Sequence, residues 1–127
     1  MMTRDPDTIL IVEDDIFISM DAADTVASTG AHVITTETVR DALDIIDSGD
    51  IRAAILDFHV LDGVITPLVA RLEKAGIPYR IVSGSTTAEI AAEGICLSFC
   101  TQKPADYLKV LKTLHADCEQ EPLRARA

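Results

Sequence analysis

The stretch ILIVEDD, residues 9–15, places three carboxylates directly after four branched aliphatic side chains. Four such residues without polar alternation predict a strand that is covered on both faces, as in the middle of a parallel sheet. In open α/β sheets, ligands bind in the crevice outside the carboxyl ends of the strands. We therefore expect Glu13, Asp14 and Asp15 to lie at the edge of a binding site.

Strand-like and helical patterns alternate along the chain, without repeats or low-complexity linkers. The strand-like runs start roughly 20 to 25 residues apart, which is the span of a β–loop–α–loop unit. They cover residues 8–13, 32–36, 53–57, 79–83 and 97–101, and the helical patterns cover residues 16–29, 39–47, 65–75, 87–92 and 105–118. Five such units with right-handed crossovers predict a doubly wound α/β fold: a five-stranded parallel sheet in the flavodoxin-like order 2-1-3-4-5, with helices on both faces.

The composition limits the class of protein. At 127 residues the chain is expected to form one domain, and its net charge of -10 argues against nucleic-acid binding, which needs clustered Lys and Arg. No apolar run reaches the ~18 residues of a membrane span, and the N-terminus lacks the apolar core of a signal peptide. Cys96, Cys100 and Cys118 are odd in number and lack CxxC spacing, which is typical of buried thiols in a reducing compartment. We expect a cytoplasmic protein that binds neither membranes nor nucleic acid.

Polar residues also follow the other predicted strands. Asp57 ends the third strand, Ser83 ends the fourth, and Lys103 follows the fifth. In the order 2-1-3 the first and third strands are neighbours, so Asp14 and Asp57 should lie side by side. With strands about 4.8 Å apart, two ionised carboxylates repel each other by roughly 3 kcal/mol at an effective dielectric constant of about 20. Such repulsion implies a compensating cation.

The groups at this edge of the sheet suit a phosphorylated ligand bound together with a metal ion. Oxygen ligands without sulfur favour Mg²⁺, which takes one or two carboxylates together with a phosphate oxygen. Ser83 adds a hydroxyl donor, and Lys103 adds a positive charge. The sequence therefore predicts a phosphoryl pocket at the carboxyl ends of the strands.

The order and positions of these residues resemble a known family. Asp14, Asp57, Ser83 and the Lys103-Pro pair, at these strand ends, resemble the site of the receiver domains of two-component response regulators. The resemblance implies that Asp57 is the phosphoacceptor and that Ser83 and Lys103 contact the phosphoryl group. The metal ligands that it implies for Mg²⁺ are all oxygen atoms: carboxylates of Asp14 and Asp57, the backbone carbonyl of His59 and, through a water molecule, Glu13.

The resemblance also implies a function in phosphorelay signal transduction. It covers residues 7–118, leaves residues 119–127 as a short C-terminal tail, and leaves no room for an output domain. A stand-alone, single-domain response regulator of this kind accepts a phosphoryl group on Asp57 from a histidine kinase or a histidine phosphotransfer protein. It is a phosphoprotein rather than an enzyme, with slow self-dephosphorylation as its only catalysis, and it signals to a downstream protein target by direct contact.

Two features depart from the usual receiver pattern. The stretch after Asp57, FHVLDGVITPL, lacks the usual Pro-Gly-containing loop, and Cys100 stands at the position of the aromatic switch, with Phe99 expected on the opposite side of the strand. The alternative is a pseudo-receiver, which is the same fold used as an interaction module without phosphorylation. Two other classes of protein fit less well. A phosphatase of the haloacid dehalogenase type needs a DxD motif, and this chain has His59 in place of the second Asp. A nucleotide-binding module needs a glycine-rich loop, which the sequence lacks.

Two single residues and one group of three residues each allow two interpretations. Asp15 is either a third acid near the metal or a residue that favours the N-terminus of the first helix. The side chain of His59 is interpreted as structural or exposed rather than as a transition-metal ligand, because no cluster of His and Cys accompanies it. Ile16, Phe17 and Met20 fit the core-facing side of an amphipathic helix better than a binding stripe.

Overall fold

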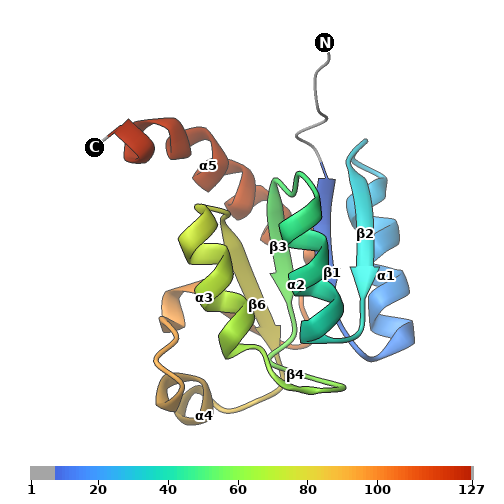
Figure 1. Cartoon of the computed structure of the whole chain (residues 1–127). Coiled ribbons are helices and arrows are strands. Elements are labelled where there is room, and N and C mark those ends of the chain that lie inside the picture. Colours follow the sequence, from blue (N-terminus) through green and yellow to red (C-terminus); the bar gives the residue numbers. More distant parts are fainter. Residues whose placement is uncertain (1–7, 127) are drawn as a thin grey trace.

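The fold is built on a parallel sheet that carries helices on both faces (Figure 1). The computed structural model describes residues 8–126, and the side chains of residues 8–116. The strands of the sheet are β1 (Thr8–Val12), β2 (His32–Thr36), β3 (Ala53–Leu56), β6 (Tyr79–Ser83) and β7 (Cys100–Gln102). They are parallel and lie in the order β2-β1-β3-β6-β7, which confirms the predicted order 2-1-3-4-5.

Within residues 8–126, five α-helices connect or follow the strands. They are α1 (Ile16–Ala27), α2 (Val39–Ser48), α3 (Thr66–Ala75), α4 (Thr87–Ala92) and α5 (Tyr107–Arg126). In Figure 1, α2 and α3 cover one face of the sheet, and α1 and α5 lie on the other. Among the described residues, no helix is both long enough and apolar enough to cross a membrane.

Apolar side chains of the central strands point alternately to the two faces and build two cores. On one face, Leu10 of β1 clusters with Leu72 of α3. On the other face, Ile9 of β1 clusters with Val26 of α1 and Leu111 of α5. Because consecutive residues of β1 are fully buried on opposite sides, the continuous apolar run at the start of the sequence belongs to a central strand, as predicted.

Two boundaries near the C-terminal end differ from the prediction. Instead of one strand over 97–101, the chain forms a 3-10 helix at Leu97–Phe99, closed by a bond from the Phe99 N–H to the Cys96 carbonyl, before the short strand β7. Strand alternation therefore does not apply between Phe99 and Cys100, and both pack against the same core, so the prediction of opposite sides was wrong. The predicted end of the last helix near residue 118 was also wrong, because α5 continues to Arg126 through the residues expected to form a tail.

A small hairpin between β3 and α3 was not predicted. It consists of β4 (His59–Val60) and β5 (Gly63–Val64), which pair antiparallel. At its tip, the carboxylate of Asp62 accepts hydrogen bonds from the N–H groups of Val39 (2.7 Å) and Arg40 (3.1 Å), at the start of α2. The hairpin thus joins the end of β3 to the N-terminus of α2.

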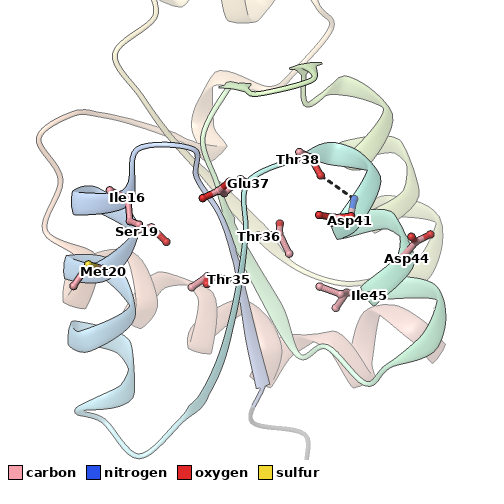
Figure 2. A pocket seen from close by; sticks show the side chains of 10 residues that line it. All are labelled: Ile16, Ser19, Met20, Thr35, Thr36, Glu37, Thr38, Asp41, Asp44 and Ile45. Atoms are coloured by element: carbon pink, nitrogen blue, oxygen red, sulfur yellow. Dashed lines mark hydrogen bonds between the residues drawn. The ribbon is translucent and has the colours of Figure 1, made fainter.

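The exposed side of α1 also differs from the prediction. Ile16 and Met20 are each 58% exposed and Phe17 is 80% exposed, whereas Ala22 and Val26 are the residues that α1 buries. The core-facing interpretation of the first three was therefore wrong, and they form an apolar surface near the carboxyl ends of the strands. Ile16 and Met20 border a groove between α1 and α2 along β2, the edge strand of the sheet (Figure 2).

The cysteines do not behave as a group of buried thiols. Cys96 is exposed and Cys100 is half-buried, and both are free. The side chain of Cys118 lies outside the described residues. The expectation of burial was wrong for Cys96 because the 3-10 turn carries it to the surface next to the Ser98 hydroxyl, 3.0 Å away.

Candidate functional site

The register of the sheet places Glu13 next to Asp57 at the carboxyl ends of β1 and β3. Val12 pairs with Leu56, so Glu13 and Asp57, the next residues of β1 and β3, leave the sheet side by side. Backbone bonds fix both: the Glu13 N–H donates to the Thr36 carbonyl (3.0 Å), and the Asp57 N–H donates to the Val12 carbonyl (2.8 Å). The two acids are therefore held by the ladder of the sheet rather than by a loose loop.

Lys103, which follows the edge strand β7, contacts both of these acids. Its ammonium group lies 2.8 Å from Oε1 of Glu13 and 3.2 Å from Oδ2 of Asp57. The backbone N–H of Lys103 donates to the Ser83 carbonyl (3.0 Å), which ties the residue to the end of β6. One cation thus bridges two carboxylates that come from neighbouring strands.

The surroundings of this bridge raise the pKa values of both Glu13 and Lys103. Burial raises the pKa of the Glu13 carboxyl above its ordinary value, and the hydrogen bonds from Lys103 and from the Asp15 N–H offset only part of this effect. For Lys103, burial acts to lower the pKa of the ammonium, but the hydrogen bond to Glu13 and the charges of Asp57 and Glu13 raise it above its ordinary value. The ammonium is therefore firmly charged.

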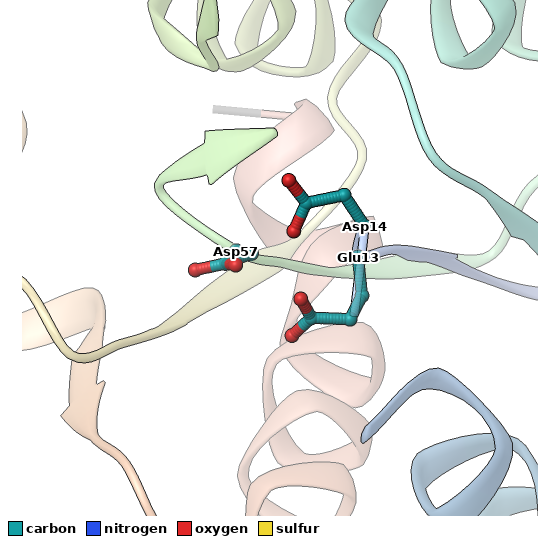
Figure 3. A group of neighbouring side chains, drawn as sticks. All are labelled: Glu13, Asp14 and Asp57. Carbon is teal, nitrogen blue, oxygen red and sulfur yellow. The ribbon is translucent and has the colours of Figure 1, made fainter. Parts of the chain in front are cut away.

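Three carboxylates share a small space at this end of the sheet. Glu13, Asp14 and Asp57 each offer an oxygen, and these oxygens lie within 4.8 Å of one another (Figure 3). Among the His, Cys, Asp and Glu side chains of the described residues, these three are the ones close enough together to share a metal ion. Asp15 is not part of it, because its carboxylate accepts from the N–H groups of Phe17 and Ile18 and caps α1. The helix-terminus interpretation of Asp15 is confirmed.

Ser83 ends β6, and His59 begins β4 of the hairpin. Ser83 is 2% exposed, and its hydroxyl accepts a bond from the N–H of Ser85 (2.9 Å). The side chain of His59 is exposed, with its ring edge-on to that of Phe58, and it is not in the metal-ligating group. This agrees with its interpretation as a non-ligating side chain.

Tyr107, at the start of α5, was missed by the sequence analysis. It is 7% exposed, and burial together with the charge of Glu13 raises the pKa of its phenol to about 12. It lines a hollow of about 410 Å³ with Phe17 and Lys103. Its place one turn after the Lys103-Pro104 pair was the available signal, but an aromatic residue at the start of a helix carries no specific chemistry by itself.

Comparisons with known proteins rest on structure rather than on sequence. No family model and no curated protein matches the sequence. A CheY-like response regulator receiver domain protein from Methanospirillum hungatei is 21% identical, with a TM-score of 0.81 over 94% of this chain and 99% of the other. SdrG from Sphingomonas melonis is 28% identical, with a TM-score of 0.68 over 88% and 95%. The receiver domain dimer of beryllofluoride-activated NtrC4 is 19% identical, with a TM-score of 0.77 over 91% and 98%.

Proposed function

We propose that this chain, which has the fold of response regulator receiver domains, is a phosphoacceptor signalling protein. Asp57 accepts a phosphoryl group from a phosphohistidine in a histidine kinase or a histidine phosphotransfer protein. The product passes the signal to a downstream protein by direct contact, and the chain turns over no substrate apart from the slow loss of its own phosphoryl group. Its place of action is the cytoplasm.

The observation that carries this proposal is the Glu13–Lys103–Asp57 bridge beside Asp14. A turn or cap would account for a lone Asp at a strand end, but not for three acids and an ammonium from three separate segments of the chain. Perturbed titratable groups that converge at the switch point of an α/β sheet favour a functional site. We infer that Asp57 is the nucleophile because its carboxylate contacts the Lys103 ammonium and is more exposed than that of Glu13, 12% against 5%.

The donor set fits Mg²⁺. Three ionised carboxylates and one ammonium leave two negative charges, which a divalent cation neutralises. The oxygens of the three carboxylates lie within 4.8 Å of one another, close enough to surround one Mg²⁺, which typically takes one or two carboxylates directly and keeps several waters. Asp14 and Asp57 would be the direct ligands and Glu13, already bound to Lys103, the water-mediated one.

The backbone carbonyl of His59 would complete the protein ligands. The Ile65 N–H donates to the Phe58 carbonyl (3.1 Å), so these two residues form a hydrogen-bonded pair of the hairpin. Pairs alternate along an antiparallel ladder, and His59 opposite Val64 is therefore a non-hydrogen-bonded pair. Its carbonyl points away from β5 and is available to a ligand outside the hairpin.

The transfer itself needs positioning and charge neutralisation rather than acid–base chemistry. An Asp57 oxygen forms a bond to phosphorus while the P–N bond of the phosphohistidine breaks, and the electron pair of that bond goes to the departing imidazole, which takes up a proton. The Lys103 ammonium, 3.2 Å from Asp57 Oδ2, stabilises charge on the phosphoryl oxygens. Bound Mg²⁺ would supply further charge neutralisation. Ser83 would donate its hydroxyl to a phosphoryl oxygen.

Surface chemistry supports a protein as the phosphodonor. Phe17 is 80% exposed at the start of α1 and borders the same hollow as Lys103 and Tyr107. An exposed aromatic beside a charged pocket favours contact with an apolar protein surface. We propose that the phosphohistidine protein rests on this part of α1 during transfer.

Intact-mass spectrometry after incubation with acetyl phosphate and Mg²⁺ tests the proposal. We expect a mass increase of one phosphoryl group, no increase with chelator, and no increase in Asp57→Asn. Asp24→Asn, which alters an exposed acid of α1 away from the site, is the matched control and should be labelled at the normal rate. Normal labelling of Asp57→Asn would overturn the assignment, and failure of labelling despite measurable Mg²⁺ binding would favour the pseudo-receiver instead.

A further inference from the structure

The edge of the sheet at β2 is open along its length. Thr36 turns its carbonyl toward β1, since it accepts from the Glu13 N–H. Successive residues of a strand turn their backbone groups to opposite sides, so Val33 and Thr35 direct theirs outward, away from β1. Within residues 8–126 neither outward group has a backbone partner, whereas the next outward carbonyl, that of Glu37, accepts from the Leu61 N–H of the hairpin (3.2 Å). The hairpin therefore closes one end of the edge and leaves the rest available.

This edge forms the floor of a groove between α1 and α2. Figure 2 shows α1 on one side of β2 and α2 on the other. The groove has a volume of about 660 Å³, and a second hollow of about 320 Å³ shares Ile45 with it and continues past Ile34. Together they follow β2 from Ile34 to Thr36, which spans roughly 10 Å at a strand rise of about 3.3 Å per residue.

The two walls of the groove have different chemistry. The α1 wall presents Ile16 and Met20, which are both more than half exposed. The α2 wall presents the exposed acids Asp41 and Asp44, and none of the described residues that line either hollow is Lys or Arg. Glu37 adds a third acid at the closed end. One wall is therefore apolar and the other is anionic.

We propose that this groove binds an extended segment of a partner protein in which apolar and basic residues alternate, added to the sheet as a strand next to β2. In such a strand, one set of side chains would face α1 and the other would face α2, because successive side chains point to opposite faces of the sheet. The apolar set would pack on Ile16 and Met20, and the basic set would lie beside Asp41 and Asp44. Val33 and Thr35 would supply the backbone hydrogen bonds.

Charge excludes the other occupants. A second copy of the chain would bring the same acids to the same place, and each chain carries a net charge of -10. A nucleic acid or an anionic membrane would be repelled by the acidic wall. A cationic segment would be attracted by the acids of the α2 wall and by the net negative charge of the chain. This surface lies beyond the phosphoryl pocket, and the inference does not depend on phosphorylation of Asp57.

Binding of a synthetic peptide to the full chain tests the inference without phosphodonor or Mg²⁺. The probe is a blocked, fluorescent seven-residue peptide in which lysine and valine alternate, and the control peptide has glutamate in place of lysine. At physiological salt we expect the lysine peptide to bind with a dissociation constant on the order of 100 µM or tighter, and the glutamate peptide not to bind. Equal binding of both peptides would overturn the inference.

Two pairs of variants locate the binding. Thr35→Pro removes the outward N–H of the edge without breaking the ladder to β1, and Thr35→Val keeps that N–H. Asp44→Lys reverses a charge in the groove, and Asp24→Lys makes the same change of net charge on an exposed position of α1 outside it. We expect Thr35→Pro and Asp44→Lys to weaken binding by about tenfold or more and the two controls by less than about twofold.

The remaining outcomes are equally decisive. If Asp24→Lys and Asp44→Lys weaken binding alike, the attraction is non-specific and the groove is not the site. If Thr35→Pro binds as well as Thr35→Val, the peptide is not an added strand. Sedimentation that shows a dimer of the unmodified chain but a monomer of Thr35→Pro would assign the edge to a second copy and overturn the cationic partner.

Discussion

Glu13 shows what the fold requires of a single residue at the end of a central strand. Its side chain is 4% exposed, and burying a carboxylate without a partner is costly. Lys103 lies 2.8 Å away and offsets this cost, yet the pKa of Glu13 is still raised because burial outweighs the ion pair. We infer that the acid is kept at this position for its function, since an apolar residue of similar size would be less expensive to bury.

Thr36, next to Glu13 across the strands, permits a test of stability at the same scale. Its hydroxyl is buried and has no hydrogen-bond partner among the described residues. A buried hydroxyl without a partner destabilises the folded state, so Thr36→Val, which keeps the shape and removes the polar atom, should raise the free energy of unfolding by about 1 kcal/mol. Urea denaturation measures this change. Thr35→Val, at an exposed position of the same strand, should change it little, and a loss of stability in Thr36→Val would show that the hydroxyl is satisfied by bound water.

At the scale of elements, the hairpin after β3 links the candidate phosphoacceptor to α2. The hydrogen bond from the Val39 N–H, together with that from the Arg40 N–H, lowers the pKa of the Asp62 carboxyl. A carboxyl with a lowered folded-state pKa contributes stability above its unfolded pKa, and this contribution is lost as pH falls through the folded-state value. The link between hairpin and helix should therefore be complete at neutral pH and broken in acid.

Asp62→Ala tests this link. We expect a lower urea midpoint and faster amide exchange at Val39 and Arg40 at neutral pH, because the first turn of α2 loses its acceptors. The difference from the unmodified chain should shrink in acid, where Asp62 is protonated in both states. Asp44→Ala, which alters an exposed acid in the middle of α2, is the control. Unchanged exchange at Val39 and Arg40 in Asp62→Ala would contradict the role of the hairpin.

If Asp57 is phosphorylated as proposed, we expect the segment from β6 to β7 to determine the conformational response. If Ser83 turns toward a phosphoryl group, its hydroxyl must release the N–H of Ser85, so the loop after β6 is the first element to respond. Phe99 is held edge-on to Tyr79, with ring centroids 5.3 Å apart, and lies under the Arg80 guanidinium, 5.2 Å from its centroid. These contacts keep Phe99 in place, and Cys100 is too small to fill the space that Ser83 leaves.

We therefore predict that NMR shifts induced by Mg²⁺ with beryllofluoride are largest in residues 84–92. Ser83→Ala should reduce these shifts because it removes the moving hydroxyl. Phe99→Ala should leave them in place and lower the free energy of unfolding by about 1–3 kcal/mol, since a half-buried ring is lost. Larger shifts at Phe99 and Cys100 than anywhere in residues 84–92 would refute this readout.

For the whole molecule, the sequence was sufficient to predict the order of the strands and the acids that meet at their ends. The apolar run before Glu13 and the regular alternation of strands and helices determine the order of strands, and the order determines which strand ends meet. The hairpin at His59–Val60 could not be predicted, because strands of two residues are too short to show alternation. The exposure of Phe17 and of Cys96 depends on the angle of α1 and on a 3-10 turn, which local patterns do not determine.

The charge of the whole molecule leads to the last prediction. With a net charge of -10, and with Glu37, Asp41 and Asp44 along the groove at β2, the surface repels a phosphate backbone, most strongly at low salt. The signal should therefore pass by protein contact, and the phosphorylated and unphosphorylated chains should both fail to bind DNA. Fluorescence anisotropy with a labelled random duplex, first at low and then at physiological salt, measures this. Lowering the salt strengthens any attraction between a cationic surface and DNA, so micromolar binding that weakens as salt is added would contradict this prediction.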